Sequence, residues 1–190
     1  MKKSTFFILF VTLIFISSCN KDEPRFTTTH IQNALFEMKG IYYGDMRVSY
    51  YHGDRISEGN ECKVVSTDSL TIHMDLEPMA STIADEAFAS RLREISVVVV
   101  KAGYDFLQMD DTMFSFVLLP GDVVVSGDHS DQSPVRIVFD QTFGGDVFHN
   151  ERNSIMFNLS PIELWIGNEK YEPFRQLVYH YEASIDNYTL

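Results

Sequence analysis

The chain lacks the features by which proteins usually span a membrane or hold nucleic acid. After an apolar run at residues 6–16, no stretch approaches the ~20 apolar residues that a membrane-spanning helix needs. Its 15 lysines and arginines are outnumbered by 27 aspartates and glutamates, and they form no basic run. The net charge of −12 repels phosphate backbones, so we expect no nucleic-acid partner.

Local catalytic motifs are missing as well. The sequence has no Gly-x-Ser-x-Gly elbow and no phosphate-binding glycine loop. Residues 67–70 (Thr-Asp-Ser-Leu) resemble the Gly-Asp-Ser-Leu block of some esterases, but the glycine is absent and Asp-Ser before a strand is ordinary turn chemistry. No Cys-x-x-Cys or His-x-x-x-His spacing occurs, so we expect neither a metal ion nor another cofactor.

The first residues have the order of an exported lipoprotein leader. A short basic start precedes the apolar run at residues 6–16, and the small residues Ser17 and Ser18 suit a signal peptidase. Residues 16–19 (Ile-Ser-Ser-Cys) resemble the lipobox of bacterial lipoproteins. That resemblance implies cleavage after Ser18 and a lipid on the sulfur of Cys19. Several acyl chains would anchor the protein to a membrane in an effectively permanent way.

The resemblance to a lipobox also sets the expected domain boundaries. Residues 1–18 are the expected signal peptide, residues 19–28 a flexible polar tether, and residues 29–190 a single β-rich domain. Without the leader, 172 residues remain with a net charge of −14, enough for one domain with a proper core. The acidic tether is similar to the export signal of Bacteroidetes surface lipoproteins, which implies the outer membrane and leaves surface exposure open. Cys62, the other of the two cysteines, is then alone and is expected in the core.

Hydrophobic periodicity predicts a mainly β protein with two helices, in the α+β class. Helices are expected at about 30–39, opened by a capping box at Thr29 and closed by Gly40, and at about 79–94 after Pro78. Nearly all other segments alternate with period two and are separated by glycine turns, which favours an antiparallel β-sandwich or barrel. Two valine runs without alternation, residues 97–100 and 123–125, are expected to be fully buried strands.

A second resemblance concerns the middle of the chain. Residues 39–44 (Lys-Gly-Ile-Tyr-Tyr-Gly) begin a strand, and the strand at residues 70–76 runs directly into the second helix. These features are similar to uncharacterised lipoproteins of gut Bacteroidetes, some of whose relatives have calycin-like barrels. The resemblance implies localisation at the cell envelope and carries no particular chemistry.

Possible metal ligands lie on two strands. His73 with Asp75, and His180 with Glu182, each share one strand face, and four such ligands could hold zinc if the strands were neighbours. The favoured interpretation is that these are polar residues on the solvent side of their strands. The acidic loop at residues 127–133 could hold calcium only weakly.

Binding residues are expected elsewhere. Residues 144–152 have two glycines, Asp146, Phe148 and His149, a mixture typical of binding loops, although a hairpin turn would need the same glycines. On the strand at residues 162–166 the alternating isoleucines and leucine face inward, which leaves Trp165 at least partly exposed. We therefore predict Trp165 as the main contact for a glycan, peptide or envelope protein, with these three loop residues as secondary candidates.

The aromatic residues of the last strand are expected inside. Tyr179 and Tyr181 alternate with His180 and Glu182. Burial of the histidine and glutamate would cost several kcal/mol unless they were paired, so the tyrosines are the better core residues.

These observations favour a lipid-anchored, non-catalytic module that binds a ligand or partner at the cell envelope. The alternatives are a hydrolase acting on surface polymers and a lipocalin-like carrier of a small apolar molecule. The three differ structurally, because an enzyme needs titratable groups converging in a cleft, a carrier needs a closed apolar cavity, and a binding module needs an exposed patch.

Overall fold

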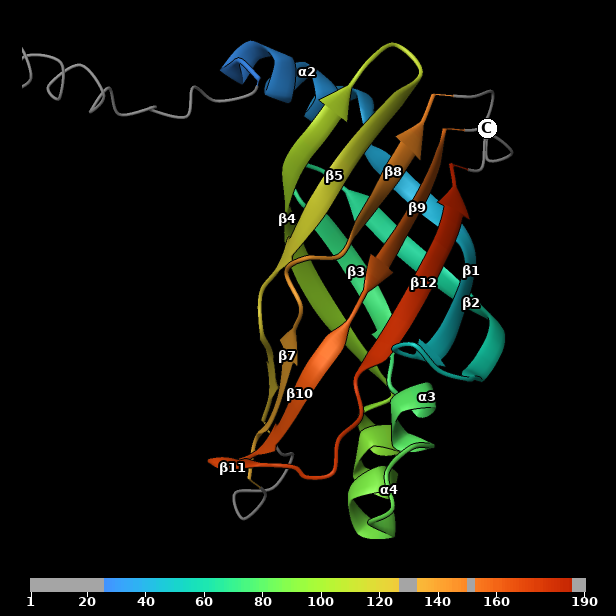
Figure 1. The fold of residues 1–190 in the computed structure, drawn as a ribbon, viewed down its shortest axis with the longest axis vertical. Helices are drawn as coiled ribbons and strands as arrows, with labels where there is room; N and C mark the ends of the chain where they lie inside the picture. Colours follow the sequence, from blue (N-terminus) through green and yellow to red (C-terminus); the bar gives the residue numbers. More distant parts are fainter. Residues whose placement is uncertain (1–25, 127–132, 150–152, 186–190) are drawn as a thin grey trace, which may run out of the picture.

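A closed β-barrel forms the body of the protein, and a smaller sheet extends from one of its ends (Figure 1). The computed structural model describes residues 26–126, 133–149 and 153–185. The predicted mainly β class with helices is confirmed, and the antiparallel strands close into a barrel. The signal peptide, Cys19 and most of the tether lie outside the described residues.

The barrel has eight strands, and each pairs with the next barrel strand along the chain until the last closes on the first. Closure leaves the barrel sheet without a free side. In chain order the strands are β1 (Gly40–Tyr50), β2 (Arg55–Ser66), β3 (Leu70–Asp75), β4 (Val97–Met109), β5 (Met113–Pro120), β8 (Gly144–Phe148), β9 (Ser154–Leu159) and β12 (Leu177–Ser184).

The second sheet is built from two excursions out of the barrel. Between β5 and β8 the chain forms β6 (Val123–Val125) and β7 (Val135–Phe139), and between β9 and β12 it forms β10 (Pro161–Ile166) and β11 (Glu169–Lys170). The excursions meet because β7 pairs antiparallel with β10, giving the order β11-β10-β7-β6.

Side chains fill the barrel interior. The inward positions are buried and alternate with half-buried or exposed outward positions, as in β3 and β5. Tyr179 and Tyr181 are fully buried on β12, which confirms their predicted place in the core. The other large inward residues include Tyr42, Phe106, Phe114, Phe116 and Phe157. Eight strands enclose a space that such side chains can fill.

The first helix, α2 (Thr28–Glu37), lies at the barrel end where β1 begins (Figure 1). Its N-cap is Thr27, whose hydroxyl accepts a hydrogen bond from the His30 backbone, so the predicted start near Thr29 was two residues late. The helix ends at a Met38 cap, and Gly40 begins a strand instead of closing the helix.

The helix predicted at about 79–94 is present over its second part as α4 (Glu86–Ile95), and a separate short helix, α3 (Glu77–Ala80), lies before it. The Ser81 and Thr82 hydroxyls donate back to carbonyls of α3 and close that helix. Asp85 then accepts hydrogen bonds from two backbone N–H groups of α4 and acts as its N-cap. Periodicity continued across the break, but local capping interrupted the helix there.

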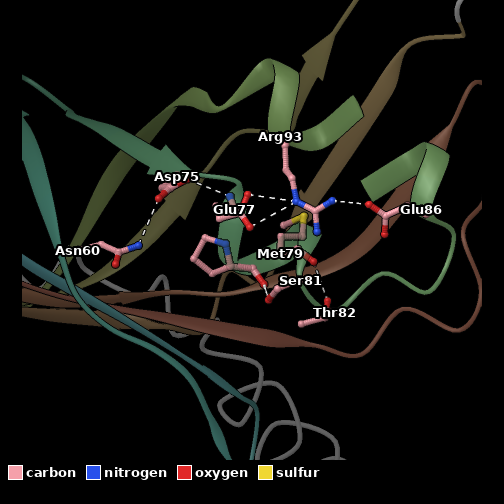
Figure 2. A network of polar contacts seen from close by, with 9 residues as sticks. Asn60, Asp75, Glu77, Met79, Ser81, Thr82, Glu86 and Arg93 are labelled. Atoms are coloured by element: carbon pink, nitrogen blue, oxygen red, sulfur yellow. Dashed lines mark hydrogen bonds and ion pairs between the residues drawn. The ribbon is translucent and has the colours of Figure 1, made fainter. Parts of the chain in front are cut away.

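Arg93 holds the two short helices together at the barrel end opposite α2 (Figures 1 and 2). Its guanidinium lies 3.3 Å from a Glu77 carboxylate oxygen and 2.9 Å from one of Glu86. Asp75 at the end of β3 accepts from the Glu77 backbone N–H and from the Asn60 side chain. This network joins the helical cap to the barrel wall.

The valine runs are also not fully buried, contrary to prediction. Along β4, Val97 and Val99 are nearly half exposed, while Val98 and Val100 are buried, so β4 alternates like its neighbours. In β6, Val124 is 59% exposed. A run of one residue type cannot reveal alternation, because identical side chains occupy both faces.

Candidate functional site

The outer wall of the barrel carries two adjoining hollows. One has a volume of about 570 Å³ over β5, β8, β9, β12 and β1, and the other measures about 520 Å³ at the ends of β1, β2 and β12. Both are lined by Arg47 and His180, so the two hollows adjoin at these side chains. We refer to them together as the outer groove.

Two glycines of β8 make the floor of the outer groove. A Cβ at Gly144 would lie 2.8 Å from the Val117 Cα of β5, and one at Gly145 would lie 2.5 Å from the Phe157 Cα of β9. Strand β8 therefore passes between its neighbours with backbone-to-backbone spacing that any side chain would prevent. The same bare backbone leaves the wall hollow at this point.

A chain of three polar side chains crosses the outer groove on adjacent strands. His180 Nε2 lies 3.1 Å from the Ser49 hydroxyl oxygen, and His180 Nδ1 lies 2.7 Å from the Asn158 amide oxygen. In the sheet, His180 of β12 stands opposite Asn158 of β9 and Arg47 of β1. Because Asn158 Oδ1 accepts from Nδ1–H, Nε2 is left free to accept the hydroxyl proton of Ser49.

Two arginines lie near His180. Arg47 and Arg55 line the smaller hollow together with Ser49 and His180. Burial, followed by the positive charges of Arg47 and Arg55, lowers the pKa of His180 below its ordinary value. Arg47 lies 3.8 Å from Glu182, and Arg55 pairs with Glu58 at 2.5 Å, both at the surface. The histidine is thus kept neutral beside two cations.

The other end of the outer groove is acidic and apolar. The Ser115 hydroxyl donates to Asp146 at 2.5 Å across β5 and β8. Leu107 and Met156, exposed to 46% and 42%, border it. The groove therefore offers a carboxylate and apolar contacts at one end and guanidinium groups at the other.

Of the four predicted binding residues, Asp146 lines the outer groove. Phe148 and His149 lie farther along, toward the barrel end that carries α2, where the His149 ring packs against Phe114 and lies 3.9 Å from Glu37. Residues 144–148 are strand β8, so the expected binding loop is mostly a barrel strand, and residues 150–152 lie outside the described residues.

Trp165 lies on the second sheet, away from the outer groove. It is half-buried, its indole N–H donates to Glu163 at 2.9 Å, and the Arg136 guanidinium lies 4.7 Å above its ring. Ile162 is only half-buried, because a register irregularity follows Pro161 in β10. Ile166 is also half-buried, although it packs against the core. The strict inward alternation that led to the Trp165 prediction is therefore interrupted.

The proposed metal pairs do not meet. His73 and Asp75 belong to β3, and His180 and Glu182 to β12, with β1 and β2 between these strands. Within the described residues, no three histidine, cysteine, aspartate or glutamate side chains are grouped to hold a metal ion. The possible calcium loop falls almost entirely on residues 127–132, which the structure does not describe.

Cys62 is a free, buried residue of the barrel wall, as predicted. Burial and the nearby Asp45 charge raise the pKa of its thiol to about 11. The thiol is therefore protonated near neutral pH and is a poor nucleophile.

Sequence reasoning missed Ser49, Asn158, Arg47 and Arg55. Alternation could have marked them as outward-facing, but they come from three strands and form no local motif. Among the described helices, none combines the length and apolar character needed to cross a membrane. No protein-family model, curated protein or solved structure matches this chain.

Proposed function

We propose that this protein is a lipid-anchored module of the cell envelope that binds an acidic glycan in the outer groove. One observation carries the proposal: the smaller hollow places Arg47 and Arg55 beside His180 with a single carboxylate, Asp54, on a chain of net charge −12. Guanidinium groups pair well with carboxylates, and the hydroxyl, amide and carboxylate groups along the groove suit sugar hydroxyls.

The carrier alternative has less support. Tyrosine and phenylalanine side chains occupy the barrel interior, whereas a carrier needs an apolar cavity there. The outer groove has mixed polarity and opens on the wall, which suits an extended polar ligand better than a small apolar one. The lipid on Cys19 would hold this groove at the membrane that displays or receives the glycan.

Calorimetric titration with an oligogalacturonate tests the binding. We expect the acidic oligomer to bind and a neutral maltohexaose to bind far more weakly. Arg47→Gln should lower the affinity for the acidic oligomer by about tenfold or more. Lys101→Gln is the matched control, because Lys101 is an exposed cation of β4 outside the groove lining. Equal affinity for the two oligomers, or equal losses in the two variants, would contradict the proposal.

A further inference from the structure

We propose that the Ser49 end of the outer groove is a hydrolytic site that cleaves acyl esters on the bound glycan. Ser49 is the nucleophile, His180 the general base and Asn158 the positioning residue. The inference rests on the proposed function for its substrate, since the groove must hold the polymer whose ester is cleaved. It replaces the non-catalytic role expected from the sequence.

The hydrogen-bond chain meets the geometric requirements of an activated serine. The nucleophile lies 3.1 Å from one imidazole nitrogen, within reach of proton transfer, and the other nitrogen is held at 2.7 Å by an amide oxygen. Such a chain is recognised by geometry and role, and an asparagine can be the third member. Here three adjacent strands supply the parts, so the pleat of the barrel wall fixes their spacing.

Burial, and after it the charges around His180, keep this residue in the state that a base requires. Arg47 of β1 and Arg55 of β2 line the hollow beside it as cations, and Asp54 of the intervening turn lines it as an anion. Asn158 of β9 is neutral, and Glu182 of its own strand is paired with Arg47. A lowered pKa leaves the imidazole unprotonated at neutral pH, able to accept the hydroxyl proton.

Arginines also suit the charge that develops during the reaction. Arg47 and Arg55 line the same 520 Å³ hollow as Ser49. Their guanidinium groups are the cationic donors of this hollow, and an oxyanion formed at Ser49 would lie beside them. They would equally attract the carboxylates of an acidic glycan and bring its ester to the serine.

The reaction is balanced with water as the only co-reactant. Ser49 Oγ bonds to the carbonyl carbon while its proton passes to His180 Nε2, and the oxyanion collapses to expel the sugar hydroxyl, which takes that proton. Water then attacks the acyl-serine and gives a proton to Nε2. The acid leaves as Ser49 Oγ recovers this proton, and no oxidant or metal takes part.

A fluorophosphonate probe and p-nitrophenyl acetate test the site in the full-length protein in detergent. We expect mass spectrometry to find the phosphonyl group on Ser49 and Ser49→Ala to lower the hydrolysis rate by about 100-fold or more. The control is Ser184→Ala, for which we expect full activity. Ser184 is half-buried on the same face of β12 as His180 but does not line the groove.

The positioning role of Asn158 is tested by the pH dependence of the hydrolysis rate. An aspartate there would favour the protonated imidazole, so Asn158→Asp should move the acidic limb of the rate profile to higher pH, and Asn158→Leu should lower the rate without that shift. A profile unchanged in Asn158→Asp would show that the residue does not orient His180, and would overturn its assigned role.

Binding and hydrolysis fail in different ways. If oligogalacturonate binds but Ser49 is neither labelled nor needed for hydrolysis, the hydrolytic site is wrong and the groove proposal stands. If Ser49 is labelled and needed but neither the oligomer nor its acetylated form binds, the site stands and the proposed glycan is wrong. Even if Ser49→Ala fails to fold, the residue that the probe labels in the unmodified protein shows whether Ser49 is the nucleophile.

Discussion

A methyl group at Gly145 should destabilise the barrel strongly. In Gly145→Ala the Cβ would lie inside the contact distance of the β9 backbone, 2.5 Å from the Phe157 Cα, so β8 and β9 must separate by about 1 Å. Overpacking of this kind costs about 1–3 kcal/mol, and weakening one or two ladder hydrogen bonds adds about 1 kcal/mol each. We expect a loss of about 3–4 kcal/mol in the free energy of unfolding.

Gly103→Ala is the matched control, because Gly103 is also a strand glycine. A Cβ there would lie 3.7 Å from the Leu119 Cβ, an ordinary contact, so the change should be neutral or slightly stabilising. At about 2–4 °C per kcal/mol, thermal melts should place Gly145→Ala about 6–16 °C below Gly103→Ala. Equal melting temperatures would mean that β8 moves aside at little cost, and our account of the groove floor would fail.

Three further predictions concern the anchor, the core and the second sheet. Mass spectrometry of membrane-extracted protein should find an acylated amino-terminal Cys19, and Cys19→Ala should release the protein from membranes. Tyr181→Phe should be neutral or stabilise by about 1 kcal/mol, because it removes a buried hydroxyl that has no hydrogen-bond partner among the described residues. Tyr42→Phe should destabilise by about 1 kcal/mol, because the Tyr42 hydroxyl donates to a backbone carbonyl. Acrylamide should quench Trp165, and more so in Arg136→Ala; an unquenched tryptophan would contradict its partial exposure.

The barrel strands could be predicted because their alternation reports burial directly. The buried tyrosines of β12 followed from the cost of burying its histidine and glutamate. Helix boundaries were harder to predict from the sequence. Asp85 lies inside the predicted helix at about 79–94, but its carboxylate caps a new helix. A periodic pattern cannot distinguish one helix from two in register when the break is only a few residues long.

The outer groove could not be predicted, because it depends on which strands are neighbours. Ser49, Asn158 and His180 were each visible as polar residues on a strand, but β1 meets β12 only through closure of the barrel. Closure joins segments about 130 residues apart, and nothing local in the sequence encodes it. The glycines of β8 were read as a flexible loop, since glycine serves both turns and close backbone approach.

Barrel geometry also bears on what the outer groove can reach. If Cys19 carries the lipid, the seven residues to Phe26 extend at most ~25 Å, so the α2 end of the barrel stays near the membrane. Ser49 lies nine residues beyond Gly40 along β1, which at ~3.3 Å per residue and a barrel tilt of ~40° is ~23 Å further from that end. The groove thus opens sideways and well away from α2. A polymer that extends ~20 Å or more from the membrane could therefore reach the groove while the α2 end stays beside the bilayer.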